Sequence, residues 1–559
     1  MADDAAEARR LLVHDALLGR GFLRKAATVG SNRYEGTFQI GDSSVPIVVV
    51  VRDLDFVTYP YIGIRPDWQS EGRKYPHVLG PGGVICYFAA GAVVLDRYDP
   101  AGTILQCLTH AEKVLRAALA GRLDADFAGE FMVYWGGTWQ LSDLPRRYVG
   151  QGTFHEVKLS DDNTMPVLSS GKSWLLERPG SSPSPRSGEP VHCVAVDEPL
   201  TLDPFAPWPP ENLAEVTDWL RWIDPRLVAE LDAAIVLGTL PAGTLAISAP
   251  NGVFSLRVAV PARLQTQEFL TNRRKSLPKL LHAIGTEVKV ERSSTVAADL
   301  DYVYGRNLGS MKGLAGKRIL QIGCGTIGSF LAQQLAQSGA GTGGGRFKLI
   351  DTDRLQPSNL GRHLLGVPHL NENKAIACAA FLNDLLPGAE IEGDDTDALM
   401  IADMNRFDLV IDATGEEALS LTLNQRAVDR RPKGPDHLFV WLKGNGALAQ
   451  AILVGDPTKA CLKCLKTELA GQPRFRDLRP EVEVEMGSIQ ACGDADFIVF
   501  PVSRPVSAAA LACDMALDWA NGGRGDRFRN ITFDTRMAFE IANSSPAPTA
   551  RCPACGTSH

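Results

Sequence analysis

The sequence predicts a multidomain α/β protein with a parallel sheet in its C-terminal part. The chain has 559 residues, and domains of about 100–200 residues predict several units rather than one core. From about residue 296, short apolar runs alternate with amphipathic stretches, the pattern of strands and helices in a parallel sheet. Two C-x-x-C pairs near the C-terminus predict a metal-stabilised fold there. We expect units at 1–150, 151–295 and 296–559.

Composition narrows the classes of function. Hydrophobic residues make up 45% of the chain and charged residues 22%, and the net charge is −8 without Lys/Arg blocks. An acidic chain of this kind is a poor candidate for nucleic-acid binding. No apolar run has the length of a membrane span, and the start lacks the features of a signal peptide. We therefore expect a cytoplasmic protein with neither nucleic acid nor membrane as a partner.

The first two units read as small α/β domains. In the first, residues 38–40 and 45–51 have strand patterns, and residues 103–119 place apolar side chains at helical spacing. A Ser/Pro/Gly-rich stretch at 180–190 marks a loop. The second unit shows no catalytic motif, and its predicted elements are a helix at 213–223 and strands at 244–248 and 252–260.

The third unit carries a glycine motif. Gly323-Cys-Gly325-Thr-Ile-Gly328 follows a predicted strand and opens a predicted helix, where glycines permit a tight turn and close approach of a phosphate. Asp351 ends the next strand, where a carboxylate can bond ribose hydroxyls. Taken alone, this Rossmann-like motif also fits an NAD-binding domain. The predicted elements are strands at 317–323, 346–351 and 408–414, and helices at 325–339 and 373–386.

The residues after this motif point to ATP. The run from Asp351 through Asn359 to Arg362, with Lys374 and Asp412 beyond it, resembles the ThiF/MoeB/HesA family and the adenylation domain of ubiquitin-activating enzymes over roughly 300–559. A carboxylate that attacks an α-phosphate brings two anions together, so cations must offset the charge.

We assign roles to these residues accordingly. The negative charge would be neutralised by Arg362, by Lys374 and by Arg306, an arginine that reaches in from outside the nucleotide site. Asn359 would bond a phosphate or ribose oxygen. Asp412 would hold Mg²⁺, which takes one or two carboxylates and keeps several waters. The family often has Gln after the arginine; here it is His363, to which we assign no role.

Four cysteines have the spacing of a metal site. Cys461/Cys464 and Cys552/Cys555 form two C-x-x-C pairs, which predict a closed tetrahedral zinc site of four thiolates with a structural role. The adenylation family carries a similar arrangement. The alternative is a set of buried free thiols.

Two further cysteines are candidates for carrying a thioester, because a thiolate both attacks and leaves readily. Cys492 lies between the zinc pairs and before a predicted helix at 506–520, and the resembling family has its activating cysteine in this region. Cys86 follows Tyr75-Pro76-His77 and a Gly-rich turn, a stretch that resembles the core of ubiquitin-conjugating enzymes over about 70–120. For each of the two, a buried structural thiol is the alternative.

The stretch around Cys86 departs from that family. His-Pro-Asn is expected where Tyr75-Pro76-His77 stands, so the asparagine amide that would stabilise an oxyanion is missing. His77 or a nearby backbone N–H would take its place as the donor.

The order of parts resembles the fused conjugating–activating enzymes of bacterial CBASS antiviral operons. The resemblance implies a conjugating-enzyme-like domain, a linker domain and an adenylation domain with a four-cysteine zinc site, assembled as a homodimer with ATP, Mg²⁺ and Zn²⁺. It implies as cargo the C-terminus of a cGAS-like nucleotidyltransferase, or a ubiquitin-like protein in related operons, joined to an amine-bearing target. A sulfur-carrier adenylyltransferase of the ThiF/MoeB type and a non-catalytic nucleotide-binding scaffold remain as alternatives.

Overall fold

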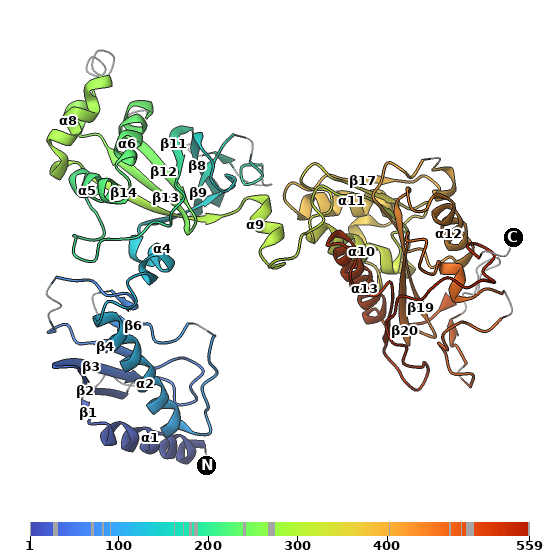
Figure 1. Cartoon of the computed structure of the whole chain (residues 1–559), viewed down its shortest axis with the longest axis horizontal. Coiled ribbons are helices and arrows are strands. Elements are labelled where there is room, and N and C mark those ends of the chain that lie inside the picture. Colours follow the sequence, from blue (N-terminus) through green and yellow to red (C-terminus); the bar gives the residue numbers. More distant parts are fainter. Residues whose placement is uncertain are drawn as a thin grey trace. The chain divides into compact units, whose positions relative to one another are not determined.

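The computed structural model consists of two compact units, Met1–Ala298 and Asp299–His559 (Figure 1). It describes residues 2–25, 32–68, 72–80, 83–89, 91–160, 163–171, 173–177, 182–183, 188–238, 242–266, 274–401, 403–468, 471–481, 483–487 and 497–556. Within these residues, no helix combines the length and the apolarity that crossing a membrane requires.

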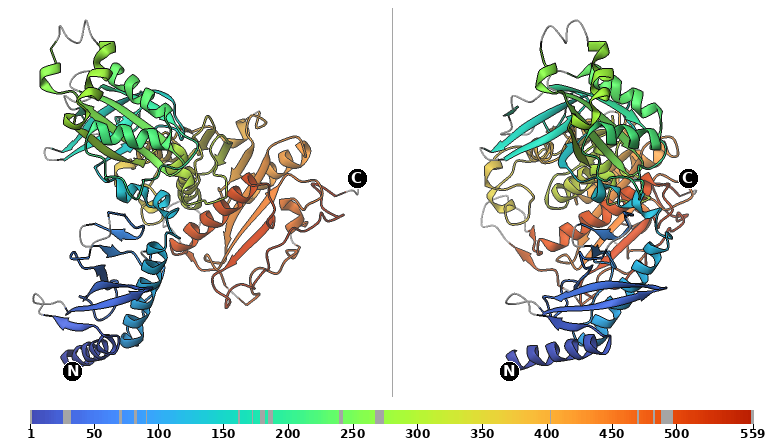
Figure 2. Two further views of the ribbon diagram at one scale, coloured as in Figure 1. Left: turned by 60° about the vertical axis from the view of Figure 1, so that its left-hand side comes forward. Right: turned by 90° about the vertical axis from the view of Figure 1, so that its left-hand side faces the viewer.

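The first unit begins with a six-stranded antiparallel sheet and two long helices (Figure 2). The helix α2 (Pro100–Leu119) turns an apolar face, including Ile104, Leu108 and Leu115, into the core of this sheet. Asp99 caps it by accepting the Gly102 N–H at 2.8 Å. These elements confirm the strands and the helix expected here. The sheet has the order β1-β2-β3-β4-β6-β5, and the elements are α1 (Ala2–Gly19), β1 (Leu23–Lys25), β2 (Asn32–Ile40), β3 (Ser43–Val51), β4 (Tyr61–Ile64), β5 (Val78–Leu79) and β6 (Val84–Ile85).

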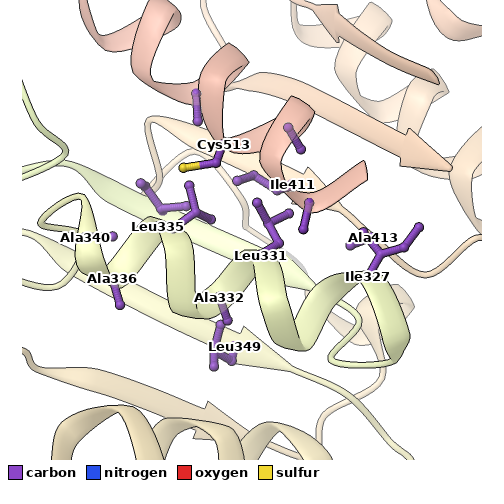
Figure 3. Packing of buried hydrophobic residues seen from close by; sticks show 14 of the residues in the cluster. Ile327, Leu331, Ala332, Leu335, Ala336, Ala340, Leu349, Ile411, Ala413 and Cys513 are labelled. Atoms are coloured by element: carbon purple, nitrogen blue, oxygen red, sulfur yellow. The ribbon is translucent and has the colours of Figure 1, made fainter. Parts of the chain in front are cut away.

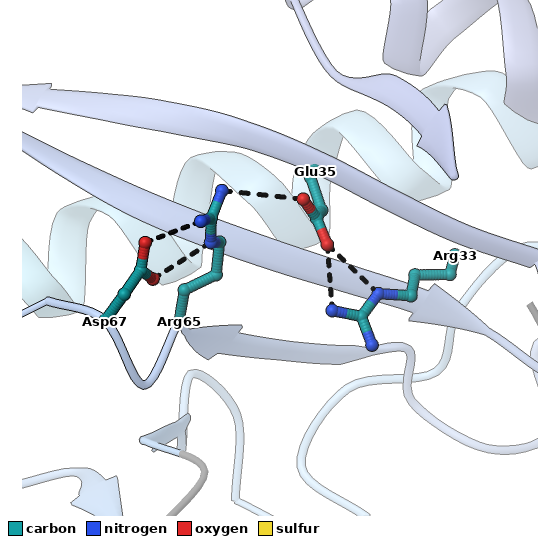
Figure 4. Close-up of polar contacts among 4 residues, drawn as sticks. All are labelled: Arg33, Glu35, Arg65 and Asp67. Atoms are coloured by element: carbon teal, nitrogen blue, oxygen red, sulfur yellow. Dashed lines mark hydrogen bonds and ion pairs between the residues drawn. The ribbon is translucent and has the colours of Figure 1, made fainter. Parts of the chain in front are cut away.

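Ion pairs cover the outer surface of this sheet. Glu35 on β2 lies between Arg33 and Arg65, and Arg65 also pairs with Asp67 at 2.5 Å (Figure 4). The Asp67 side chain is 58% exposed, so solvent screens the attraction and the pairs contribute little to stability.

The second sheet of this unit has eight strands, and a cluster of aromatic residues packs against it. Phe131, Trp135, Trp219 and Phe254 pack together against it. The strand β7 (Thr138–Ser142) pairs with β14 in this sheet, although it lies within the range 1–150. The predicted domain boundaries stay predictions. The sheet order is β10-β8-β11-β12-β13-β14-β7-β9, with β8 (Gly150–Ser160), β9 (Asn163–Ser169), β10 (Ser182–Pro183), β11 (Glu189–Ala195), β12 (Ala242–Ala249), β13 (Gly252–Ala259) and β14 (Val290–Ala297). Its helices are α3 (Asp126–Gly129), α4 (Phe131–Trp135), α5 (Leu213–Ile223), α6 (Arg226–Leu237) and α8 (Leu277–Ala283).

The second unit contains a seven-stranded sheet in the order β17-β16-β15-β18-β19-β20-β23. The five strands from β17 to β19 pair in parallel, as the alternating pattern predicts, whereas β20 and β23 form an antiparallel edge that the pattern did not predict. The strands are β15 (Arg318–Ile322), β16 (Arg346–Ile350), β17 (Ile391–Asp394), β18 (Leu409–Asp412), β19 (Asp436–Lys443), β20 (Leu448–Val454) and β23 (Phe528–Thr532), beside a small hairpin of β21 (Met486–Gly487) and β22 (Phe497–Ile498).

Helices cover both faces of this sheet. On one face α10 packs against α13, with Leu331 and Leu335 beneath Cys513 (Figure 3). Strand residues alternate between the faces: Ile319 belongs to this core, and Leu320 belongs to the core on the other face. The helices are α9 (Leu300–Gly305), α10 (Thr326–Gln337), α11 (Lys374–Leu385), α12 (Glu417–Arg430) and α13 (Ser503–Ala520), the last beginning three residues before the predicted 506.

Candidate functional sites

The glycine motif forms the loop between β15 and α10. Its three glycines have different surroundings, which explain differently why a side chain is absent at each. Gly323 has a φ of +89°, and a Cβ there would lie 2.9 Å from the Thr414 side chain. A Cβ on Gly328 would lie 2.0 Å from the Gly323 carbonyl oxygen. At Gly325 no atom lies within 4 Å of the Cβ position. The first and third glycines therefore permit close packing, and the second leaves room at a helix N-terminus, where an anion is favoured.

Two carboxylates flank this loop at the ends of β16 and β18, the strands on either side of β15. Asp351 accepts the Cys324 N–H at 2.7 Å and the Asp353 N–H at 2.8 Å, which fixes it against the loop. Asp412 is 3% exposed and accepts hydrogen bonds from the Thr414 N–H and from the hydroxyls of Thr414 and Ser420. Burial raises the pKa of Asp412. Its described partners are two hydroxyls and one backbone N–H rather than a cation, and a buried carboxylate of this kind suits a divalent cation.

The predicted cationic residues lie in different settings. Lys374 begins α11, is 8% exposed and bonds Asp353 at 2.8 Å. Arg362 is half-buried three residues after Asn359, whose side chain accepts the Gln356 N–H at 2.9 Å. Arg306, exposed at the end of α9, stacks over Tyr302 at 5.9 Å from the ring centre. The structure thus brings Lys374 and Asp351 to one strand end, and the role of Arg306 stays a prediction.

His363 has a structural role that the sequence did not reveal. Its Nε2–H donates to the Cys324 carbonyl at 2.7 Å, and its Nδ1 accepts the Leu365 N–H at 3.0 Å. Burial lowers the pKa of His363, so the ring is held neutral, which suits one donated and one accepted bond. The imidazole therefore ties the glycine loop to the segment carrying Arg362.

The four predicted metal ligands lie together. The sulfur of Cys461 is 3.9 Å from that of Cys464 and 3.7 Å from that of Cys552, and the sulfurs of Cys464 and Cys555 are 3.3 Å apart. Sulfurs at about 2.3 Å from a tetrahedral zinc lie about 3.8 Å from one another. Asn424 on α12 donates to the Cys461 sulfur at 3.7 Å. Donor type and spacing both fit a closed zinc site.

A cavity of about 460 Å³ opens beside the glycine loop. Its wall begins at Gly325 and Thr414 and continues along β19 at Trp441 toward the segment after Cys461. Three lysines contribute to its lining: Lys443, Lys463 and Lys466. The cavity therefore joins the loop to the region of the cysteine cluster within one unit.

Of the two candidate thioester cysteines, Cys86 lies within the described residues. Cys492 lies outside the described residues. Cys86 is half-buried just after β6, and its N–H donates to the His77 carbonyl at 2.8 Å, which extends the β5–β6 pairing by one residue pair. Burial and the charge of Glu130 raise the pKa of the Cys86 thiol.

His77 lies beside Cys86 with a φ of +61° and both ring nitrogens engaged. Its Nδ1 is 2.7 Å from Glu130 and its Nε2 is 2.9 Å from Asp126. The suggested role of His77 as an oxyanion donor stays a prediction, and in this geometry its ring faces carboxylates instead. Sequence reasoning assigned no role to these two acids. Their spacing of four residues, one helical turn, was the available signal.

Comparisons with known proteins match the two parts of the chain that carry these sites to two different families. The ThiF family model matches residues 303–519, and the Prokaryotic E2 family B model matches residues 21–140. Among solved structures, E. coli MccB with MccA-N7isoASN aligns at 17% identity and a TM-score of 0.35, covering 46% of this chain and 76% of that chain.

Three relatives that align with this chain over most of their length carry the name "ATP-dependent ubiquitin transferase-like protein Cap2". The protein from Pseudomonas aeruginosa (strain BWHPSA011 / Pa011) is 32% identical over 519 residues, which is 90% of this chain and 91% of that protein. The one from Vibrio cholerae serotype O1 is 27% identical, covering 82% and 83%, and the one from Escherichia coli (strain TW11681) is 27% identical, covering 87% and 88%. This chain therefore belongs to the Cap2 family of ATP-dependent ubiquitin transferase-like proteins, enzymes that fuse an E2-like domain to a ThiF-type domain.

Proposed function

We propose that this enzyme activates the C-terminal carboxylate of a protein with ATP, carries the acyl group as a thioester and ligates it to an amine. The observation that carries the proposal is the presence of two chemically distinct sites in one chain. One is an open glycine loop between Asp351 and Asp412. The other is a half-buried thiol, Cys86, beside His77 and Glu130.

Activation takes place at the glycine loop. An oxygen of the cargo carboxylate attacks the α-phosphorus of ATP, and pyrophosphate leaves with the bonding electron pair. Arg362 and Lys374 offset the negative charge that gathers there, and Asp351 and Asn359 bond ribose and phosphate oxygens. Asp412 would hold Mg²⁺, which lowers the charge repulsion at the phosphates when it is bound. Arg306 would reach the site of the other subunit in a homodimer.

The cavity beside the loop suits the C-terminal residues of the cargo. It begins at Gly325, where the phosphate would lie, and is bordered by lysines that attract a carboxylate. An extended peptide end placed along β19 would bring its terminal carboxylate to the α-phosphate.

Two thiols then carry the acyl group. The Cys492 thiolate attacks the acyl carbon and AMP leaves, and Cys86 takes the acyl group by thioester exchange, which frees the Cys492 thiol. An amine attacks the Cys86 thioester, the C–S bond breaks and an isopeptide bond forms. A backbone N–H or His77 donates to the oxyanion. Zinc bound by Cys461, Cys464, Cys552 and Cys555 would hold the segment around Cys552 to the rest of the second unit.

The proposed cargo is a cGAS-like nucleotidyltransferase in CBASS antiviral defence, with a bacterial ubiquitin-like protein as the second candidate. The relatives' printed name, with "ubiquitin transferase-like", supports conjugation to an amine. A sulfur-carrier adenylyltransferase would use the second unit and leave Cys86 and the first unit without a role.

The test has two stages with the full-length protein. Cargo-dependent ATP–pyrophosphate exchange is expected for an adenylating enzyme, and its absence with both candidate cargoes would reject the proposal in favour of a scaffold. A covalent cargo adduct that an added thiol cleaves by thioester exchange, lost at Cys86 in Cys86→Ala but retained at Cys492, is expected for the relay. Exchange without any adduct at Cys86 would favour the sulfur-carrier alternative.

A further inference from the structure

Three different metal-binding side chains meet around Cys86 in the first unit. One ligand atom from each of His77, Cys86 and Glu130 lies within 4.8 Å of the other two. Thiolate sulfur, imidazole nitrogen and carboxylate oxygen are the donors that zinc takes in proteins. Within the described part of the chain, the four-cysteine cluster is the only other group of this kind. The donor set beside Cys86 therefore fits zinc by its chemistry.

The backbone holds these ligands close together. The Cys86 N–H donates to the His77 carbonyl at 2.8 Å, next to the β5–β6 pairing. The third ligand is tied to the first, because the His77 N–H donates to the Glu130 carboxylate at 3.2 Å. His77 has a φ of +61°, a conformation that residues other than glycine rarely adopt and that gathers at functional positions. The cluster is thus a feature of the folded backbone and does not depend on one side-chain rotamer.

The His77 ring is oriented as metal-bound imidazoles are. Its Nδ1 lies 2.7 Å from Glu130, and its Nε2 lies 2.9 Å from Asp126. A histidine that binds zinc through one nitrogen almost always donates the N–H of the other to a carboxylate, a carbonyl or water, which fixes the tautomer and the ring orientation. Asp126 stands where that partner is expected. The two carboxylates would satisfy the ring without a metal, and the thiol beside them is what adds a further donor.

The group is open enough to take an ion from solution. Cys86 is half-buried, and the side chains of His77 and Glu130 are each 22% exposed. Nitrogen and oxygen ligands at about 2.0–2.2 Å from a tetrahedral zinc lie about 3.4 Å from each other. The Nδ1 and the carboxylate must therefore move apart by several tenths of an ångström, which rotation of the partly exposed Glu130 side chain supplies. Three protein ligands leave one position for water, unlike the closed four-cysteine site.

We propose that the His77 Nδ1, the Cys86 sulfur and a Glu130 carboxylate oxygen form a second zinc site with one open position. On binding, the Cys86 thiol releases its proton to solvent and its sulfur donates an electron pair to Zn²⁺, so no oxidant or reductant takes part. The metal-bound sulfur cannot attack a thioester carbon. Resting on the proposed function, zinc in this site reversibly blocks transfer of the acyl group to Cys86.

The test uses the full-length protein and reads metal binding before it reads transfer. Protein whose four-cysteine site is filled is titrated with zinc chloride, and alkylation of Cys86 by iodoacetamide is followed by mass spectrometry of its peptide. Native protein should lose Cys86 alkylation as it takes up a second zinc ion, and a chelator that leaves the first site filled should restore it. Cobalt in place of the second zinc should give a thiolate-to-cobalt absorption band that Cys86→Ala lacks.

Variants separate the ligands from their neighbours. Glu130→Gln removes one ligand and should abolish protection of Cys86 at a zinc concentration that protects the native protein. Asp126→Asn changes only the partner of the His77 Nε2, and should weaken zinc binding by about 10- to 100-fold. Asp67→Asn, on the outer surface of the first sheet, should bind zinc as the native protein does. Circular dichroism checks the fold of each variant, and His77→Gln replaces Glu130→Gln if the latter does not fold.

The outcomes distinguish the site from the reaction. Unchanged alkylation of Cys86 in excess zinc would overturn the site, and so would equal protection in Glu130→Gln and in the native protein. The block is measured separately, with ATP and cargo, as less adduct on Cys86 with zinc than with chelator. Protection from alkylation with undiminished adduct formation would overturn the block. Failure of the metal-free native protein to form any adduct would instead overturn the proposed function and leave the zinc site standing.

Discussion

The glycine-loop site and the Cys86 site use polar side chains in opposite ways. At the glycine loop the key groups are buried, with Lys374, His363 and Asp412 at 8%, 7% and 3% exposure. At the thiol site His77 and Glu130 are each 22% exposed and Asp126 is 44% exposed. A buried polar group that loses its partner costs stability, whereas a half-open one can turn to water. We therefore expect changes in the second unit to disturb fold and chemistry together, and changes around Cys86 to alter chemistry alone.

The largest expected effect follows removal of zinc from the second unit. Cys552→Ser, or a strong chelator, should destabilise this unit by on the order of 10 kcal/mol, because the bound metal contributes its binding energy to the fold. Thermal unfolding with the zinc content measured by mass spectrometry checks this. Cys513→Ala, which removes a buried thiol from α13, should keep its zinc. Zinc-free protein that melts at the native temperature would contradict the assignment.

Asp412→Ala and Arg362→Ala come next. Each should lower cargo-dependent ATP–pyrophosphate exchange by about 100- to 1,000-fold, the usual cost of one missing electrostatic contact in the transition state. Cys86→Ala should leave exchange at the native rate, since the thiol acts after the adenylate has formed. Native exchange rates in both variants would contradict the electrostatic roles of Asp412 and Arg362. The transfer between the two thiols would then lack an explanation for how its acyl-adenylate forms.

The same contrast explains what could be predicted from sequence. The strands β15 and β18 and the glycine loop are local in sequence, so apolar runs and a spaced motif were enough to predict them. The antiparallel edge was not predictable in this way, because β20 pairs with β23 across about eighty intervening residues. His77 and Glu130 are 53 positions apart, and the fold alone brings them together.

A smaller effect should appear in the pH dependence of the second unit. His437 on β19 is 3% exposed, its Nδ1–H donates to the Pro435 carbonyl at 3.1 Å, and burial lowers its pKa to about 4. The unfolded ring, with a pKa of about 6.5, binds a proton first as the pH falls. Stability is therefore fully present above pH 6.5 and lost progressively down to about pH 4, by up to about 3 kcal/mol.

Denaturant unfolding of the native protein and of His437→Phe between pH 7.5 and 4 measures this contribution. The variant should lose stability less steeply over that range. His369→Gln, which removes a histidine that pairs with Glu372 at 3.1 Å in the same unit, is the matched control and should follow the native slope. A native slope in His437→Phe would show that this ring does not stay neutral in the folded protein.

The smallest expected effect lies on the outer surface of the first sheet and tests the other half of the comparison. Asp67→Asn removes one partner of Arg65, which keeps Glu35 at 3.5 Å and is itself 37% exposed. Because water replaces the lost carboxylate, the free energy of unfolding should fall by less than about 1 kcal/mol, measured by urea unfolding at low and at moderate salt. The difference should shrink further as salt screens the pair. A loss well above this value would mean that the first unit also depends on fixed polar contacts.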